Sequence, residues 1–141
     1  MTTRGQTLLE LAVVLALAAL LAMAVFPPLT YALDRSAVES ATRAIVLAHR
    51  EARTEAATRN ELLLLTIAPD TLILRPAGGG PPLWARRGPA RLGVTVTGPT
   101  KTLRFIPFGY TIGASNASWT LRRGHAERRV VVSRLGRVRV E

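Results

Sequence analysis

The sequence predicts an α+β protein in which a long N-terminal helix packs on a small antiparallel β-sheet domain. Three patterns carry this prediction. Residues 11–33 hold no charged side chain, residues 34–59 place small apolar side chains at helical spacing, and residues 61–141 divide into short runs that suit strands. A single helix followed by antiparallel strands defines the α+β class.

The first element combines a short leader with an apolar helix. Residues 1–5 form the leader, and residues 6–33 follow with one acid, Glu10, near their start. The 23 uncharged residues from 11 to 33 reach roughly 35 Å at about 1.5 Å per residue, against a bilayer core of about 30 Å. This length predicts a transmembrane helix.

Two adjacent prolines interrupt the apolar segment. Pro27 and Pro28 remove backbone donors and crowd the preceding turn, which predicts a kink or a local loosening near Val25 and Phe26. The alternative is a helix that ends at Phe26 and restarts at Leu29.

The helix of residues 34–59 belongs to the globular domain of residues 34–141. Its spacing gives one small, apolar face with charges between. We expect Arg59 and Asn60 to end it. The face consists of Ala37, Ala41, Ala44, Ile45, Ala48, Ala52 and Ala56.

The β-rich part spans residues 61–141. Residues 62–67 and 71–74, joined by a turn, predict a hairpin. Residues 76–90 are rich in glycine and proline and predict a loop. The remaining expected strands are residues 92–97, 102–106, 119–122, 128–133 and 137–140.

Charge is distributed unevenly along the chain. Residues 1–80 hold seven arginines and seven acids, whereas residues 81–141 hold eleven arginines and Lys101 against Glu127 and Glu141. The whole net charge of +10 therefore belongs to the C-terminal part. Such asymmetry favours a polyanionic partner, either nucleic acid or an acidic surface.

Composition gives little support to catalysis. The chain has no cysteine, which excludes disulfides and thiolate metal sites. His49 and His125 are expected at the surface, and no nucleophile, carboxylate pair or metal-ligand spacing is recognisable. We therefore expect neither an enzyme nor a cofactor or metal.

The N-terminal motif Arg4-Gly5-Gln6-Thr7-Leu8-Leu9-Glu10 resembles the signal of type IV prepilins and type II secretion pseudopilins. The resemblance implies that a prepilin peptidase cuts after Gly5, that Gln6 is then N-methylated, and that Glu10 contacts a neighbouring subunit during assembly. Gln6 departs from the usual phenylalanine. The alternative is an ordinary N-terminal membrane anchor in which Glu10 only caps the helix, on a basic domain that never enters a filament.

Three further segments resemble the FimT/GspH group of minor pilins and pseudopilins. They are "AHREARTEAATRNELLLLTI", "LRFIPFGYT" and "RRVVVSRLGRVRV". The resemblance implies a single-pass inner-membrane protein with a periplasmic globular domain that later joins a filament of other pilin subunits. Two roles follow from it: a type IV minor pilin that aids assembly and binds DNA for uptake, or a type II secretion pseudopilin that acts only through protein partners.

A C-terminal arginine cluster carries the DNA hypothesis. Gly136-Arg137-Val138-Arg139 matches a Gly-Arg-x-Arg pattern that the resemblance associates with DNA binding. In a strand, Arg137, Arg139 and Glu141 share one face, while Val138 and Val140 point to the core. Gly136 is expected to turn the chain and leave backbone N–H groups open to an anion.

Further arginines extend this candidate site. Arg134 lies just upstream, and Arg86 and Arg87 beside Trp84 suggest a mobile basic finger. Two pairs flank a Gly-His turn and could lengthen the stripe: Arg122 with Arg123, and Arg128 with Arg129. Such contacts bind phosphate without reading sequence. The alternative is that the arginines protect a sheet edge or pair with acids of the next subunit.

Overall fold

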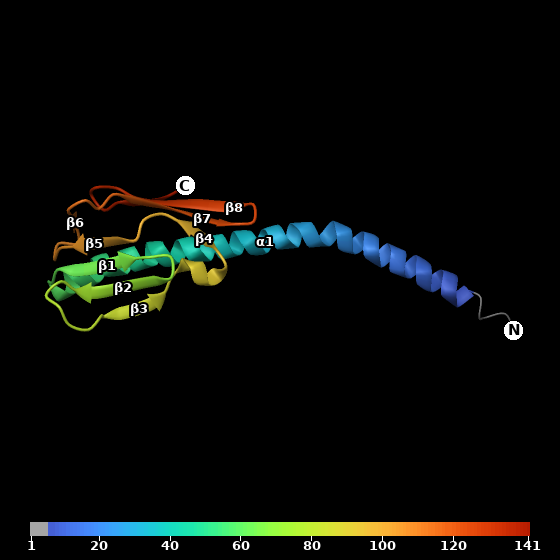
Figure 1. Ribbon diagram of the computed structural model, residues 1–141, viewed down its shortest axis with the longest axis horizontal. Coiled ribbons are helices and arrows are strands. Elements are labelled where there is room, and N and C mark those ends of the chain that lie inside the picture. Colours follow the sequence, from blue (N-terminus) through green and yellow to red (C-terminus); the bar gives the residue numbers. More distant parts are fainter. Residues whose placement is uncertain (1–5) are drawn as a thin grey trace. The chain divides into compact units, whose positions relative to one another are not determined.

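The computed structural model describes residues 6–141, apart from the side chains of residues 6 and 24–27. Residues 1–5, including Gly5 and the expected cleavage point, lie outside the described part. The chain divides into two compact units, Met1–Leu33 and Asp34–Glu141. The helix α1, Gln6–Arg59, belongs to both, and every strand belongs to the second (Figure 1).

In the first unit, α1 is apolar and its described side chains are largely exposed. By length and composition, α1 contains a segment that could cross a membrane. The helix continues through Pro27 and Pro28 without a break in its assignment. The interpretation in which it ends at Phe26 and restarts at Leu29 is therefore wrong, and the kink stays a prediction.

In the second unit, α1 presents the predicted small face to the core. Val38, Ala41, Ile45, Ala48, Ala52 and Ala56 are buried. Alanine lets the backbone approach its neighbours closely because only a methyl group intervenes. The helix ends at Arg59, as predicted, and Asn60 follows in the left-handed region at φ 53°. Asparagine is one of the few non-glycine residues that tolerates this helix-ending conformation.

The first of two antiparallel sheets has the order β3-β2-β1-β5-β6. The predicted hairpin is confirmed, with Leu65 opposite Leu74. Residues 76–90 are not all loop, because residues 84–87 form an edge strand paired with β2. The strands are β1 Leu63–Ile67, β2 Thr71–Pro76, β3 Trp84–Arg87, β5 Lys101–Phe105 and β6 Thr111–Ile112.

The second sheet has the order β4-β7-β8-β9, with β9 at an edge. The expected strand at residues 92–97 is shorter, because a 3₁₀ turn, Pro89–Leu92, precedes it and ends at Gly93 with φ 68°. The strands are β4 Thr95–Thr97, β7 Ala117–Arg123, β8 Ala126–Val132 and β9 Val138–Val140.

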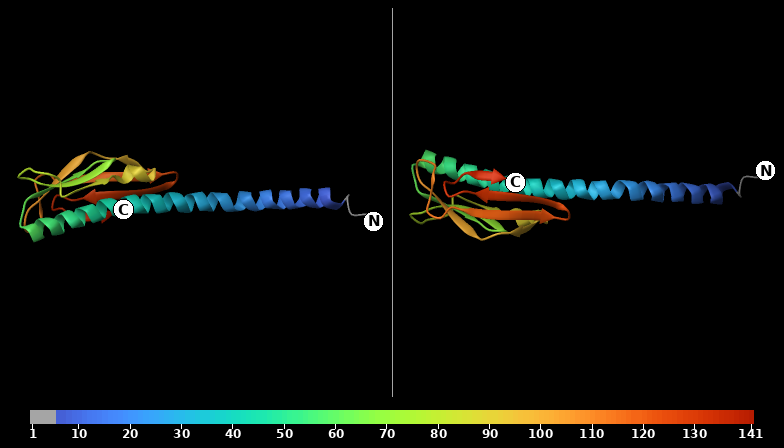
Figure 2. Two further views of the ribbon diagram at one scale, coloured as in Figure 1. Left: turned by 90° about the horizontal axis from the view of Figure 1, so that it is seen from below. Right: turned by 90° about the horizontal axis from the view of Figure 1, so that it is seen from above.

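One hydrophobic core joins α1 of the second unit to both sheets. Its largest buried side chains are Trp119 and Phe105. The Trp119 indole N–H donates to the Pro99 carbonyl at 2.8 Å, which satisfies its polar atom inside the core. Figure 2 shows the strands gathered on one side of this part of α1, with β9 beside the helix.

Candidate nucleic-acid interface

Arg139 lies in the last strand, β9, and Arg137 lies just before it, and both side chains are exposed. Ladder pairing sets Arg139 opposite Val131, and Arg129 exchanges two backbone hydrogen bonds with Glu141 at 2.8 Å each. Because side chains alternate along a strand, Arg137, Arg139 and Glu141 share a face, as predicted. Val138 packs against the core, as predicted.

Two details of the predicted strand are wrong. Val140 is 48% exposed rather than in the core, because no strand lies beyond β9 to cover the end of the sheet. Gly136 does not offer free N–H groups either. Its own N–H donates to the Ser133 carbonyl at 2.9 Å, and the Arg137 N–H donates to Ser133 Oγ at 3.1 Å.

Gly136 is instead a packing residue of the β8–β9 turn. It adopts φ 75°, which favours glycine, and it is buried. A Cβ at this position would collide with the Thr111 side chain, so the turn lies directly against β6. This contact fixes where Arg137 leaves the turn.

A hollow of about 1020 Å³ lies between α1 and the C-terminal segment, within the second unit. Four arginines and one acid, Glu141, are among its lining residues. Among the described residues, none of these arginines forms an ion pair. The arginines are Arg50 and Arg53 from α1, and Arg137 and Arg139 from the C-terminal segment.

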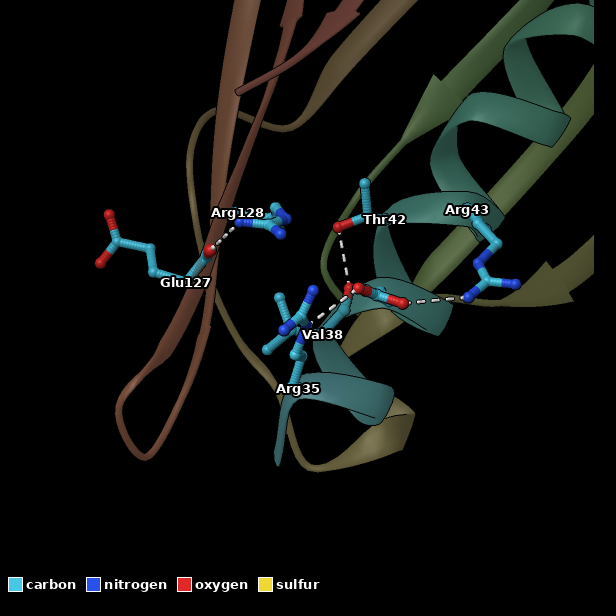
Figure 3. A network of polar contacts seen from close by, with 7 residues as sticks. Arg35, Val38, Thr42, Arg43, Glu127 and Arg128 are labelled. Carbon is cyan, nitrogen blue, oxygen red and sulfur yellow. Dashed lines mark hydrogen bonds and ion pairs between the residues drawn. The ribbon is translucent and has the colours of Figure 1, made fainter. Parts of the chain in front are cut away.

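A second hollow of about 450 Å³ shares Val46, Arg50 and Val140 with the first. Its lining adds Arg43 and Arg128. Figure 3 shows Arg128 extending from β8 toward the Thr42 side chain of α1. We call the two hollows together the basic groove. Its arginines are Arg43, Arg50, Arg53, Arg128, Arg137 and Arg139.

One carboxylate of the basic groove is already neutralised by α1 itself. Glu39 accepts hydrogen bonds from Arg35 at 3.3 Å and from Arg43 at 3.2 Å. The hydrogen bond from Arg35 is the main cause that lowers the pKa of Glu39. Because Arg43 is itself a groove arginine, Glu39 offsets its charge and leaves Arg50, Arg53, Arg128, Arg137 and Arg139 as the groove arginines without an ion pair among the described residues.

The α1 wall of the basic groove was not among the sites predicted from the sequence. Arg50 and Arg53 have no acid three or four residues away, whereas Arg59 pairs with Glu55 at 2.7 Å. On a helix those positions are the neighbouring ones. The absence of an acid at these positions was the signal in the sequence that could have indicated the α1 wall, since an arginine without a local partner is free to face a ligand.

Three of the arginines expected in the site lie elsewhere or are engaged. Arg86 donates to both oxygens of Glu51 at 2.7 and 2.8 Å and stacks on the Trp84 ring at 4.4 Å. Arg86 is thus a strand side chain that these contacts hold in place, and the prediction of a mobile basic finger is wrong. Arg87, on the same strand, is exposed and outside the basic groove. Arg123 pairs with Asp34 at 2.9 Å.

Arg122, Arg129 and Arg134, which were also expected in the site, do not line the basic groove. Adjacent arginines point to opposite faces, so the predicted pairs separate. Arg122 and Arg129 are exposed, and Arg129 donates to Ser118 Oγ at 3.3 Å. Arg134 is exposed in the β8–β9 turn.

His49 is buried, which corrects the surface placement expected for it, whereas His125 is exposed as expected. The His49 ring meets the Phe105 ring edge-on, with 5.0 Å between the ring centres, and its Nε2 has no hydrogen-bond partner among the described residues. Burial, followed by the charge of Arg53, lowers the pKa of His49 to about 4. The ring is therefore neutral near pH 7 and adds no charge to the groove.

Two solved structures share this fold. Both are crystal structures of the type IV minor pilin FimU from Pseudomonas aeruginosa strain PAO1, in space groups P21 and P65. Their TM-scores are 0.62 and 0.55 at 18% identity, and the matches cover 76% of this chain and 90% and 91% of theirs. The fold is thus that of a pilin. No curated protein sequence matches the chain.

The sequence assigns the chain to one family within the pilin class. The profile described as Type II transport protein GspH matches residues 41–136, which include most of the globular helix and β1 to β8. The chain belongs to the GspH family of minor pilins and pseudopilins. Members are structural subunits rather than known enzymes, and they assemble with other pilin subunits. The apolar N-terminal helix fits membrane anchoring.

Proposed function

We propose that this chain is a minor pilin of a type IV pilus that aids filament assembly and binds DNA electrostatically for uptake. The observation that carries the DNA part is the basic groove. Arginines from α1 and from the C-terminal segment line it, and among the described residues only Glu39 and Glu141 line it as acids.

Arginines on two walls suit a polyanion better than a small anion. Guanidinium groups bind phosphate through fixed, forked donors, and each neutralised phosphate releases counterions. Nothing in the groove is arranged like a recognition helix in a major groove. The proposed binding is therefore independent of sequence and strongly dependent on salt.

The assembly part rests on the N-terminal motif. In this proposal the prepilin peptidase cuts between Gly5 and Gln6, Gln6 is methylated, and Glu10 contacts the next subunit. Before assembly the chain crosses the inner membrane once, with residues 34–141 in the periplasm. The likeness of the fold to FimU, a type IV minor pilin, supports the choice of a type IV pilus.

A second candidate is a minor pseudopilin of a type II secretion system that acts through protein partners only. The description of the matching family, Type II transport protein GspH, favours it. Under this candidate, acids of a neighbouring subunit would occupy the basic groove, and the protein would bind no DNA.

A salt titration separates the two candidates. Full-length protein in a nonionic detergent is titrated into fluorescent duplex DNA at several salt concentrations. We expect affinity to fall with salt, and the slope to drop by about 2 in Arg137→Ala/Arg139→Ala, because each phosphate contact contributes about 0.9.

The matched control removes two charges elsewhere. Arg75→Ala/Arg91→Ala changes exposed arginines that do not line the basic groove. It should leave the slope nearly unchanged. Absence of binding at low salt, or equal losses in both double variants, would contradict the DNA proposal and favour the secretion candidate.

A further inference from the structure

Two aromatic side chains lie exposed close together in the chain, and one of them, Tyr110, lines the basic groove. Phe108 is 80% exposed and Tyr110 is 60% exposed, both in the turn between β5 and β6. Aromatic rings normally bury most of their surface, and in this domain Trp119 and Phe105 do so completely. The exposure of these two rings to solvent therefore suggests that a binding partner covers them.

The turn that carries the two rings is rigidly built. The Gly109 N–H donates to the Ile106 carbonyl at 2.8 Å, and the Ile106 N–H donates to the Tyr110 carbonyl at 2.9 Å. A Cβ at Gly109 would lie 3.2 Å from the Arg53 side chain, so the turn rests on α1. The backbone thus fixes where both side chains leave the turn, while the rings themselves remain accessible to solvent.

The Tyr110 ring also borders the arginines directly. Tyr110 lines the same hollow as Arg50 and Arg137, and the Arg53 guanidinium carbon lies 5.8 Å from the centre of the Tyr110 ring. Leu135, 84% exposed, lines the same hollow from the facing β8–β9 turn. The end of the groove therefore combines flat apolar surface with positive charge.

This combination distinguishes between partners. A purely apolar partner would leave the arginines unpaired, and an acidic partner would leave the rings uncovered. In a duplex the bases are stacked inside the helix and cannot reach a protein ring, whereas the bases of a single strand can stack on one. Charge and shape together fit an unpaired strand.

We propose that the basic groove binds single-stranded nucleic acid, with bases stacked on Phe108 and Tyr110 and the adjacent phosphates on Arg50 and Arg137. The proposal rests on the proposed DNA binding and specifies its substrate as a single strand or an unpaired end. Stacking of this kind tolerates any base, so it adds affinity without sequence preference.

The test compares three probes with full-length protein in a nonionic detergent. They are a single strand of about 12 nucleotides, within the range of single-strand site sizes, an abasic strand of equal length, and the corresponding duplex. All carry phosphates, but only the first offers free bases. We expect the single strand to bind at least about fivefold tighter than the abasic strand, the lower end of a stacking contribution.

Variants assign the effect to the rings. Phe108→Ala/Tyr110→Ala should bring the single strand down to the abasic affinity and weaken duplex binding by a clearly smaller factor, since a duplex offers the rings no free bases and the loss of two exposed side chains spares the core. Tyr110→Phe keeps the ring and should behave as the unchanged protein does.

The outcomes separate this inference from the proposed function. Equal affinity for the single and abasic strands, or equal loss of single-strand and duplex binding in the double variant, would overturn the stacking proposal while duplex binding persists. No binding to any of the three probes would overturn DNA binding itself, and would leave the exposed rings to a neighbouring subunit.

Discussion

His49 places a titratable ring in the core, where α1 faces the β8–β9 turn. Its neighbours in the sequence are polar or charged on one side and apolar on the other, which made a surface position the natural expectation. Long-range contact with Phe105 decides otherwise. His49 lies four residues after Ile45 and three before Ala52, so helical spacing did place it beside the buried face, although no local pattern reports its contact with Phe105.

The burial of His49 makes stability depend on pH. Its pKa is 6.5 when unperturbed and about 4 in the folded chain. Between these values the unfolded chain binds more protons, so stability is lost as pH falls through the window. The loss is about 1.4 kcal/mol per pH unit and about 3 kcal/mol in full.

Urea unfolding at a series of pH values from about 7 to about 4.5 tests this expectation. Trp84 and Trp119 both lie in residues 34–141, so their fluorescence reports that unit within the full chain. His49→Phe should flatten the dependence on pH relative to the unchanged protein, since it keeps a ring beside Phe105. An equal slope in both proteins would assign the effect to other groups.

At the scale of elements, pattern predicted the helix and most strands. The helix end at Arg59, the β1–β2 hairpin and the strands β5, β7, β8 and β9 follow from apolar spacing and turn residues, and all are confirmed within a few residues. The helix and the strands β1, β2, β5, β7 and β8 bury one face each, and a buried face leaves a period in the sequence.

Strand β3 left no such period. It is an edge strand that follows a Gly-Gly-Gly-Pro-Pro run, and three of its four residues are exposed. Its side chains are held by two individual contacts and not by a repeating apolar face. Arg86 forms an ion pair with Glu51, and the Trp84 ring lies beneath the Arg86 guanidinium. Such a contact between distant residues becomes visible only in the structure.

This ion pair leads to a prediction that separates stability from binding. Arg86→Ala should lower the free energy of unfolding by about 1 kcal/mol, a modest effect because both side chains are partly exposed. It should leave the salt slope of DNA binding unchanged, since Arg86 does not line the basic groove.

Arg87→Ala is the matched control on the same strand. Arg87 is exposed and forms no ion pair among the described residues, so its loss should change neither quantity. A reduced salt slope in Arg86→Ala alone would return Arg86 to the binding site.

At the scale of the whole molecule, the apolar segment and the net positive charge lie in different parts of the sequence. Residues 11–33 supply an apolar segment without charge, and residues 81–141 supply all of the net charge of +10. Composition alone therefore predicted an anchor and a basic domain. It could not predict that α1 contributes half of the groove's arginines, since residues 1–80 are neutral in sum.

The proposed assembly role predicts the effect of one acid in the anchor. Glu10→Ala should abolish incorporation into filaments, because a neighbouring subunit would lose the carboxylate that its N-terminal amine contacts. The measurement is the amount of this chain in sheared filaments relative to that in membranes.

Glu61→Ala removes an acid from the globular domain and serves as the control, with normal incorporation expected. Incorporation of Glu10→Ala at the normal level would indicate an ordinary membrane anchor and would remove the basis for a filament role.

The two walls of the basic groove also differ in mechanical strength. One wall is α1, whose small face is built into the core along its length in the second unit. The other ends in β9, a short terminal strand joined to its sheet along one edge only. A three-residue edge strand is held by few ladder hydrogen bonds, whereas a buried helix must leave the core as a whole. If the groove binds DNA as proposed, tension on the bound strand would therefore open it on the β9 side first and release the load while the rest of the domain stays folded.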